Sequence, residues 1–310
     1  MKIKKILVTG GAGFVGSHIV DALIKKGFKV VIIDNLSTGK KKNINSKAKF
    51  YKLDIRSKKI RDVFKKEKFD YVFHLAAQMD VRKSVADPLY DADVNIIGSL
   101  NLIHNSAQCK VKKFVFTSSG GVVYGDTKHL PTTEKEDTNP ISPYGVSKLS
   151  IEKYLFYFHK EFSLPYVCLR PANIYGPRQR SDGEAGVVAI FINKILKGEQ
   201  PIINGDGKNT RDYVYVGDVV KANLLALKPR AHGAYNIGTG KETTVNQILD
   251  KIAGAFAQPV KKVRGPAKPG EQRRSCLDYN KIKKELGWQP KVDLDAGLKK
   301  TVEWMRIHST

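Results

Sequence analysis

The strongest constraint on the fold is a glycine-rich turn between two apolar segments near the start of the chain. Residues 6–8 form a short apolar run typical of a buried parallel strand, and the turn Thr9-Gly10-Gly11-Ala12-Gly13-Phe14-Val15-Gly16 follows. An amphipathic segment begins at Ser17, and a second strand-like run, residues 28–33, ends at Asp34. A strand, turn, helix, strand and acidic residue within about 30 residues predict a unit that binds a dinucleotide.

Each part of this unit has a physical reason to grip such a ligand. Gly10 and Gly13 let the turn tighten and let the backbone approach a pyrophosphate, while Gly16 lets the helix pack closely on the sheet. The start of the helix offers free N–H donors to the anion, and Phe14 and Val15 of the turn are expected to lie at the cofactor. Asp34 can accept hydrogen bonds from a ribose diol and would repel a 2′-phosphate, so NAD is expected rather than NADP. The open alternative is a purely structural glycine turn.

Composition bounds the class of protein. The chain has 310 residues, of which 41% are hydrophobic and 27% charged, as in ordinary globular proteins. Its apolar runs are far shorter than the roughly 20 residues that span a bilayer, and the basic start, Met1–Lys5, leads into the fold without a signal peptide. We expect a cytoplasmic protein with no membrane partner. Cys109, Cys168 and Cys276 are scattered, so we expect packed thiols and neither a disulfide nor a metal site.

The net charge of +24 raises the question of nucleic-acid binding. The lysines lie in short clusters throughout the chain, with no basic arm and no recognised nucleic-acid module. This pattern favours a solvated basic surface that attracts anionic nucleotides over a specific nucleic-acid partner.

Strand-like and helix-like segments alternate up to about residue 175. Strands are expected near residues 50–53, 71–75, 113–117 and 166–169, and helices near 58–66, 88–108 and 144–162. The alternation predicts an α/β fold with a Rossmann-like doubly wound parallel sheet. After Gly176 the rhythm breaks, which predicts a smaller C-terminal substrate-binding domain with a helix near 187–197, a strand at 201–203 and helices at 281–286 and 293–305. We place the domains at 1–175 and 176–310, with their elements partly interleaved.

Several residues follow strands of the predicted sheet, where open parallel sheets bind ligands. Asp54 and Ile55 come directly after the third strand and are expected to flank an adenine. The fourth strand opens into Leu75-Ala76-Ala77-Gln78, whose small residues leave room for a cofactor. His74, inside that strand, is interpreted as a buried core residue and not as a catalyst.

Tyr144 and Lys148 are four residues apart in a segment expected to be helical, so their side chains share one face. An ammonium near a phenol lowers the phenol's pKa from about 10 by stabilising the phenolate. Tyr144 is therefore a candidate general base that takes a proton from a sugar or alcohol hydroxyl as hydride leaves the carbon. Lys148 can also hold the nicotinamide ribose. Ser118 and Ser119, at the end of the preceding strand, can hydrogen-bond the same substrate oxygen.

These features together resemble a known family. The segments that carry the resemblance are Thr9–Gly16, Asp34–Gly39, Asp54-Ile55, His74–Gln78, Ser118–Gly121, Tyr144–Lys148, Arg170–Pro177, Arg211–Tyr213 and Leu286–Trp288. Over essentially its whole length the chain is similar to the extended short-chain dehydrogenase/reductases of the NAD-dependent sugar epimerase/dehydratase family, and most similar to UDP-glucose 4-epimerases within it.

The resemblance implies a mechanism and a set of site residues. NAD stays bound through turnover, Tyr144 takes the proton of the sugar 4-hydroxyl while hydride passes from C4 to the nicotinamide, and the 4-keto sugar rotates before hydride returns. Ser119 matches the catalytic serine or threonine, with Ser118 as the second choice. The implied NAD-binding residues are Gly10, Gly13, Phe14, Val15, Gly16, Asp34, Asn35, Ser37, Thr38, Gly39, Asp54, Ile55, Leu75, Ala76, Ala77, Gln78, Asn95, Tyr144, Lys148 and Pro171. A homodimer formed through the 88–108 and 144–162 helices is also implied.

The substrate implied is a UDP-hexose, whose nucleotide diphosphate is held by Asn173 and Arg211. Lys268 stands in Lys268-Pro269-Gly270-Glu271 where the family usually has arginine, which predicts a looser diphosphate grip. Asn204 replaces an aromatic residue that often stacks on uracil, so thymidine stays open as the base. Ser275 falls where members restricted to glucose and galactose carry a bulky tyrosine, which predicts that the N-acetyl sugars are also substrates.

Other reactions remain open on this scaffold. A nucleotide-sugar 4,6-dehydratase needs an Asp-Glu pair where this chain has Ser118-Ser119-Gly120, which argues against that reaction. A nucleotide-sugar decarboxylase and a 2-epimerising relative are alternatives of the same low rank as the dehydratase. From a different class, the chain could be a non-catalytic dinucleotide-binding regulator or an RNA-associated protein, against which the intact Tyr144, Lys148 and Ser119 argue.

Overall fold

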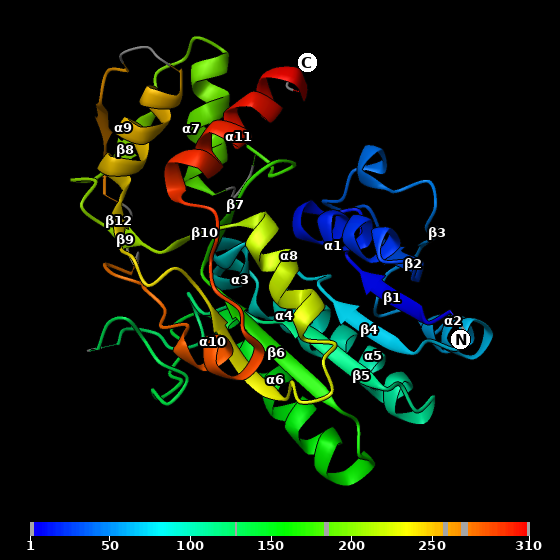
Figure 1. Cartoon of the computed structure of the whole chain (residues 1–310). Helices are drawn as coiled ribbons and strands as arrows, with labels where there is room; N and C mark the ends of the chain where they lie inside the picture. The colour runs from blue at the N-terminus through cyan, green and yellow to red at the C-terminus, as the bar shows by residue number, and fades with distance from the viewer. Residues whose placement is uncertain (1–2, 128, 183–185, 257–259, 268–271, 309–310) are drawn as a thin grey trace.

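The computed structural model describes residues 3–127, 129–182, 186–256, 260–267 and 272–308. Its centre is a seven-stranded sheet with the order β11-β6-β5-β4-β1-β2-β3, in which every neighbouring pair is parallel (Figure 1). The strands are β1 (Lys5–Thr9), β2 (Lys29–Asp34), β3 (Lys49–Lys52), β4 (Tyr71–His74), β5 (Lys113–Thr117), β6 (Tyr166–Pro171) and β11 (Gly233–Ile237). The predicted Rossmann-like parallel sheet is confirmed.

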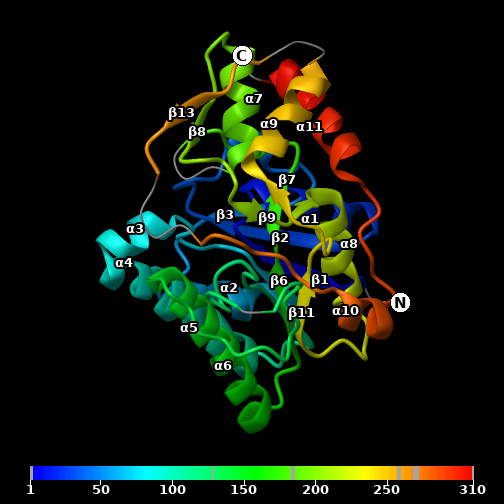
Figure 2. The same ribbon diagram turned by 90° about the vertical axis from the view of Figure 1, so that its left-hand side faces the viewer.

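Helices cover both faces of this sheet. On one face lie α1 (Phe14–Lys25), α8 (Val216–Leu225) and α10 (Asn280–Leu286). On the other lie α2 (Ile60–Glu67), α5 (Gly98–Gln108) and α6 (Pro143–Phe162). Between α2 and α5 the chain forms α3 (Val81–Ala86), α4 (Pro88–Ala92) and the π-helical turn η2 (Asp93–Ile97). Figure 2 shows α5 and α6 running side by side. The predicted 88–108 helix is thus α4, η2 and α5 in continuous succession.

The alternation of side chains along the strands explains why both faces are covered. In β1, Ile6 and Val8 belong to the core cluster under α1 and α8, whereas Leu7 belongs to the cluster under α2, α5 and α6. All three side chains are fully buried. Successive residues of a strand point to opposite faces, so a strand that is apolar throughout requires cover on both sides.

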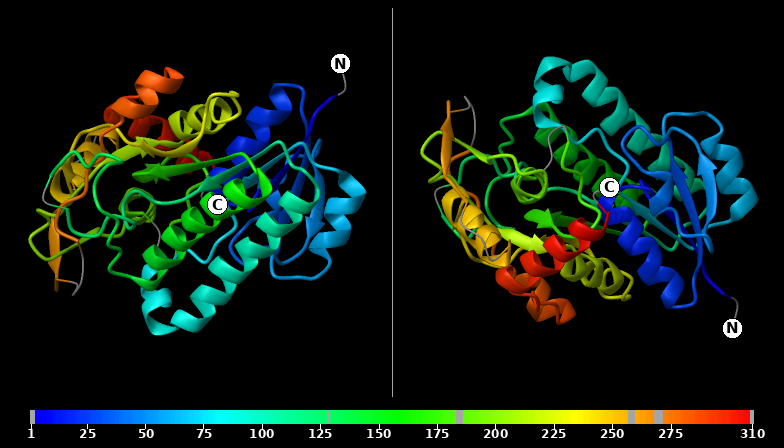
Figure 3. Two further views of the ribbon diagram at one scale, coloured as in Figure 1. Left: turned by 90° about the horizontal axis from the view of Figure 1, so that it is seen from below. Right: turned by 90° about the horizontal axis from the view of Figure 1, so that it is seen from above.

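A smaller group of elements forms a separate core beyond the sheet, at the upper left of Figure 1. It consists of α7 (Val187–Leu196), α9 (Val245–Phe256) and α11 (Leu294–His308), together with the short strand pairs β7 (Asn173–Tyr175) with β10 (Tyr213–Tyr215), β8 (Ile202–Asn204) with β13 (Val263–Gly265), and β9 (Thr210–Arg211) with β12 (Thr243–Thr244). A short 3-10 turn, η1 (Lys41–Asn43), lies after β2. The views of Figure 3 show the same two groups from below and from above.

Some elements differ from the sequence-based expectation. β11, α8 and α10 come from beyond residue 175 and yet pack in or on the main sheet. The strand β11 was not anticipated, because its five residues carry few apolar side chains. The helices α10 and α11 agree with the expected ones, and Gly287 ends α10 with a φ of 74°. The division into two domains at 175 remains a prediction.

Two further findings concern membranes and thiols. Among the described helices, none combines the length and the apolar composition that a bilayer crossing requires. The three cysteines are free; Cys168 and Cys276 are buried and Cys109 is partly exposed.

Candidate active site

The glycine-rich turn lies where the strand order reverses, between β1 and β4. Ligands bind outside the carboxyl ends of strands at such a switch point. Gly10 has a φ of 69°, and a Cβ there would stand 2.8 Å from the backbone nitrogen of Ala76. A Cβ at Gly16 would collide with the carbonyl oxygen of Gly10, so this glycine lets α1 begin directly against the turn. The first N–H groups of α1, which have no acceptor inside the helix, therefore face the switch point.

Asp34 ends β2 beside this turn, as predicted. Its carboxylate is buried and accepts the backbone N–H groups of Ala12 (3.0 Å) and Leu36 (2.8 Å). Gly39 lies against the same carboxylate, since a Cβ on Gly39 would stand 2.9 Å from Asp34 Oδ1. Each carboxylate oxygen retains acceptor capacity for a ligand hydroxyl.

Two other residues predicted to contact the cofactor, Asp54 and Asn95, form hydrogen bonds within the protein. The Asp54 carboxylate accepts from Arg56 and from Asn35 Nδ2 (2.9 Å), and the Arg56 hydrogen bonds lower its pKa to about 2. The amide of Asn95 holds the loop after β4: its Oδ1 accepts from Gln78 N, and its Nδ2 donates to Gln78 O, each at 2.9 Å. Asn95 therefore shapes the Leu75–Gln78 loop from the π-helical turn.

His74 is a buried core residue, as expected. Its Nδ1 lies 2.7 Å from Thr9 Oγ1 and its Nε2 lies 2.7 Å from Ser99 Oγ. Ser99 donates its own proton to the carbonyl of Asn95, so Nε2 carries the proton and Thr9 donates to Nδ1. Burial, together with the nearby Lys148 ammonium, lowers the pKa of His74 to about 3.

The Tyr144–Lys148 pair lies in the first turns of α6. Ser142 caps this helix by accepting the N–H of Gly145 (3.2 Å), and Pro143 occupies its first position. Lys148 is buried, donates from Nζ to the carbonyl of Thr117 (2.9 Å), and lies 5.6 Å from the centroid of the Tyr144 ring. The two side chains thus share a face, and the end of β5 anchors the lysine.

Burial and nearby charges act on Lys148 in opposite directions. Loss of hydration lowers its pKa to about 8, while the carboxylates of Asp91 and Glu152 oppose that shift. This pKa lies close to neutral pH, so a small change in the surrounding charge changes the fraction of Lys148 that is protonated.

The structure separates the two candidate serines. Ser118 is buried, and its hydroxyl donates to Glu152 Oε1 (2.6 Å). Glu152 is paired with Arg170, whose Nη2 lies 2.6 Å from Oε2. Ser119 is partly exposed, and among the described residues its hydroxyl has no hydrogen-bond partner. This arrangement favours Ser119 over Ser118 as the group that meets a substrate oxygen.

The predicted substrate residues come from segments that pack on one another. The Asp212 carboxylate accepts the backbone N–H groups of Thr239 (2.9 Å), Gly240 (3.2 Å) and Leu277 (3.3 Å). The backbone carbonyl of Asp212 accepts the N–H of Asn173 (2.9 Å). Arg211, the residue before it, lies in β9. Asp212 thereby joins the Asn173, Arg211 and 275–277 segments.

The remaining substrate residues lie around this junction. Thr210 N donates to the carbonyl of Arg273 (3.0 Å), two residues before the buried Ser275. A Cβ on Gly120 would collide with Leu277, so the segment after Ser275 lies against the strand end that carries the serines. Asn204 ends β8. Lys268 and Glu271 lie outside the described residues.

The remaining predicted NAD residues lie near the carboxyl ends of the sheet strands, as the glycine-rich turn does. Phe14 and Val15 begin α1, Ile55 is buried against Gly98, and Pro171 ends β6. Asn35, Ser37 and Thr38 form the loop after β2, where Ser37 N donates to Asn35 Oδ1 and the Thr38 carbonyl accepts from Arg180. Ala77 follows β4. The turn whose glycines leave no room for a Cβ, the start of α1 and Asp34 together fit a dinucleotide such as NAD.

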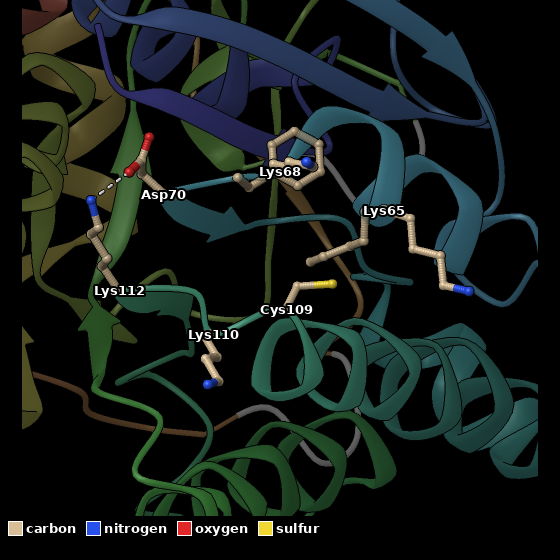
Figure 4. Close-up of a pocket in the computed structure, with 8 residues that line it drawn as sticks. Lys65, Lys68, Asp70, Cys109, Lys110 and Lys112 are labelled. Carbon is tan, nitrogen blue, oxygen red and sulfur yellow. Dashed lines mark hydrogen bonds and ion pairs between the residues drawn. The ribbon is translucent and has the colours of Figure 1, made fainter. Parts of the chain in front are cut away.

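A recess at the opposite end of the strands, where β4 and β5 begin, is a separate feature (Figure 4). It lies where α2 and α5 end, next to Asp70 and Lys112, which precede β4 and β5 and form an ion pair of 2.7 Å. Lys68 and Lys110, on its rim, follow those two helices. Cations are favourable at helix C-termini, so helix capping accounts for these lysines.

Sequence reasoning missed the buried carboxylates that organise the site. Asp91, Glu152 and Asp212 are each at most 8% exposed and each joins segments that are distant in the chain. One signal was present in the sequence: Glu152 lies four residues after Lys148, hence one helical turn away. The partners of Asp91 and Asp212 follow no local spacing.

Comparison with known proteins agrees with this geometry. A UDP-glucose 4-epimerase of Mycolicibacterium smegmatis is 44% identical over 311 residues, which cover 98% of this chain and 99% of that protein. The crystal structure of a UDP-glucose 4-epimerase with UDP-glucose from Thermotoga maritima is 51% identical, covers 99% of this chain and 100% of its own, and has a TM-score of 0.97. A UDP-N-acetylglucosamine 4-epimerase from Methanobrevibacter ruminantium, in complex with UDP-N-acetylmuramic acid, is 39% identical with full coverage (100%) of both chains and a TM-score of 0.94.

A family model matches residues 6–238, from β1 to the end of β11. This range contains the glycine-rich turn, the strand end with the serines and the helix that carries Tyr144 and Lys148. The chain therefore belongs to the NAD dependent epimerase/dehydratase family.

Proposed function

We propose that this protein catalyses the NAD-dependent 4-epimerisation of a UDP-hexose. The observation that carries the proposal is that the Tyr144–Lys148 pair, held by the end of β5, and the glycine-rich turn after β1 lie at the same end of the parallel sheet. The hydroxyl of Ser118 donates to Glu152, so the partly exposed Ser119 supplies the available hydroxyl at that strand end. The substrate named for the Thermotoga maritima relative, UDP-glucose, supports the choice of a UDP-hexose.

The side chains perform the proton chemistry of the reaction. Tyr144, as phenolate, accepts the proton of the sugar 4-hydroxyl, and the ammonium of Lys148 stabilises the negative charge on the phenolate. The hydroxyl of Ser119 holds the same sugar oxygen. NAD, when bound, supplies the acceptor and later the donor of hydride at C4. After the 4-keto sugar turns over in the pocket, Tyr144 returns its proton to the oxygen.

The substrate-holding residues fall on the junction around Asp212. We place Asn173 and Arg211 against the nucleotide diphosphate, since both flank this junction. Ser275 is small and buried, two residues from Leu277, which touches Gly120 near the reacting end. A serine leaves more volume than a tyrosine, so we expect the site to accept an N-acetyl group on the sugar. The relative that is named a UDP-N-acetylglucosamine 4-epimerase supports this extension.

The experiment that tests the proposal uses purified protein without added cofactor. UDP-galactose and UDP-N-acetylgalactosamine are incubated separately, and the gluco epimers are measured by chromatography. Conversion of both sugars is expected. Conversion of UDP-galactose alone would retain the epimerase and reject the role of Ser275. Conversion of neither sugar, even after NAD is added, would reject the proposed reaction.

We also propose that the protein forms a homodimer through α4, η2 and α6. Apolar side chains on these helices are exposed, among them Leu89 (82%), Ile97 (55%) and Val146 (48%). α4 and η2 both contact α6, so these exposed side chains belong to helices that pack on one another. Burial of these side chains against a second copy would remove their apolar area from water.

A cytoplasmic location is part of the same proposal. The three cysteines are free thiols, which is the state that the reducing cytosol maintains. Fractionation of cells that express the protein, followed by immunodetection, tests the location, and recovery in a secreted or membrane fraction would reject it.

A further inference from the structure

Asp91 is a carboxylate deep inside the protein. It lies on α4 and is 1% exposed. Its Oδ1 accepts from Gln78 Nε2 (3.0 Å) and Asn95 Nδ2 (2.9 Å), and its Oδ2 accepts from Ser147 Oγ (2.7 Å). These donors are neutral groups, and no lysine or arginine among the described residues forms an ion pair with Asp91. Burying a charge without a direct counter-ion costs free energy, which suggests that the Asp91 carboxylate has a function.

The charge that Asp91 faces is that of Lys148. Two carboxylates act electrostatically on the Lys148 ammonium, Asp91 and Glu152. The Arg170 guanidinium forms a hydrogen-bonded ion pair with Glu152, so it offsets most of that carboxylate's charge. Asp91 has no such partner, so its full negative charge remains to stabilise the ammonium.

Asp91 also joins two segments of the candidate site, the loop that follows β4 and the helix α6. Gln78 belongs to the loop after β4, and Ser147 is the neighbour of Lys148 on α6. A second contact supports the same joint, because the N–H of Tyr144 donates to Ser84 Oγ on α3 (3.2 Å). Figure 2 shows α3 and α4 at the end of the paired α5 and α6 helices. The carboxylate therefore fixes the Gln78 loop relative to the helix that carries Tyr144 and Lys148.

We propose that Asp91 is a positioning residue of the reaction: it keeps Lys148 charged without touching it and ties the Lys148 helix to the Gln78 loop. Its relevance to turnover rests on the proposed epimerase function, whereas its action on Lys148 is a property of this chain alone. The charged and titratable groups around Lys148 are Asp91 from α4, Glu152 and Tyr144 from α6, and His74 from β4, which stays neutral.

The consequence is a defined pH range for the lysine. With Asp91 ionised, burial leaves the pKa of Lys148 at about 8, so the ammonium persists at neutral pH. Removing the carboxylate charge leaves the cost of burial unopposed, and the lysine then loses its proton at lower pH. A neutral Lys148 no longer stabilises the Tyr144 phenolate, so activity is lost on the alkaline side of the profile.

Asp91→Asn isolates the charge, because an amide can still accept from Gln78 and donate to Ser147. The first measurement follows the ε-nitrogen of Lys148 by nuclear magnetic resonance in protein labelled with ¹⁵N-lysine, with Lys148→Arg to assign the signal. We expect the titration midpoint to fall by about one pH unit, a tenfold loss of proton affinity. The alkaline limb of the kcat profile should move down by about the same amount.

Asp93→Asn is the matched control, since Asp93 lies on η2 two residues away and pairs with Arg56 at the surface. It should leave the Lys148 midpoint unchanged. Ser147→Ala, which keeps the Asp91 charge and removes one contact, should lower kcat without moving the midpoint. An unchanged midpoint in Asp91→Asn, or an equal shift in Asp93→Asn, would overturn the proposal.

A stability cycle covers the case in which Asp91→Asn does not fold alone. Lys148→Met removes the charge that Asp91 serves, so Asp91→Asn should destabilise the wild-type background but not the Lys148→Met background. Equal destabilisation in both backgrounds would reject the coupling. Neither this cycle nor the lysine titration needs substrate, so failure of the sugar assay alone rejects the reaction and leaves the Asp91–Lys148 coupling intact.

Discussion

The phenol of Tyr144 is the group on which the proposed chemistry depends most. Tyr144→Phe keeps the ring against Lys148 and removes the proton acceptor. We expect kcat to fall by about 10²–10⁴-fold, the usual contribution of a general base, while NAD remains bound. Chromatographic turnover and NAD extracted from the purified variant provide the two measurements.

Tyr154→Phe provides the control for that substitution, because Tyr154 lies on the same helix and is 40% exposed. It should retain wild-type turnover. If Tyr144→Phe keeps turnover within a factor of about two, a role in proton transfer is excluded.

Ser275 is the residue at which substrate size is expected to be set. A tyrosine at this buried position would occupy the volume that an N-acetyl group needs. We expect Ser275→Tyr to lower kcat/KM for UDP-N-acetylgalactosamine by at least about tenfold and to leave UDP-galactose within about twofold, because steric selection of this kind is worth 1–3 kcal/mol. Ser275→Ala should retain both activities. Equal losses for both sugars in Ser275→Tyr would contradict the assignment.

How far the site can be read from sequence depends on the range of its contacts. Gly10, Asp34 and the Tyr144–Lys148 pair were predictable, because each belongs to a short motif whose spacing fixes its geometry. Asp91 acts through Ser147 and Gln78, residues 56 and 13 positions away in the chain. Such contacts are set by the packing of whole helices, so no local pattern in a single sequence reveals them.

At the scale of elements, His74 joins β4 to β1 and α5 through Thr9 and Ser99. Its pKa is about 3 in the folded protein, against about 6.5 for an unfolded chain. Between those values the unfolded chain binds a proton that the folded protein does not. The stability present above pH 6.5 is therefore lost progressively as the pH falls toward 3.

The expected loss from His74 is roughly 2 kcal/mol between pH 6.5 and 5.0, at about 1.4 kcal/mol per pH unit. Urea unfolding at both values measures it. His74→Gln should show a smaller loss by that amount, whereas His104→Gln, at an exposed position on α5, should behave as wild type. The same pH dependence in all three proteins would show that His74 is not the sensor.

Elements were predictable where periodicity was strong. The strands β1, β2 and β4 follow from apolar runs near the start of the chain, and the helix α6 follows from the alternation of strand-like and helix-like segments. The helix α8 and the strand β11 were not anticipated, because polar or small residues interrupt the apolar ones in both segments. The pairing of β11 with β6 and the packing of α8 on α1 place these two elements, and such tertiary contacts override weak local preference.

At the scale of the whole molecule, the exposed apolar helices predict the oligomeric state. Val146→Glu places a charge on the proposed interface between copies, so we expect a dimer for the wild type and a monomer for the variant in sedimentation velocity. Ile307→Glu is the control, because Ile307 is 73% exposed near the end of α11, away from α4 and α6. A wild-type monomer, or a Val146→Glu dimer, would reject the interface.

The position of β11 bears on how the chain folds as it is synthesised. Until residues 233–237 leave the ribosome, β6 is the outer strand of the sheet and its unpaired edge is open to other chains. The nucleotide-binding half therefore cannot finish folding when residue 175 has emerged, even though most of its strands are already made. A nascent chain of that length is expected to need protection from aggregation until its seventh strand arrives.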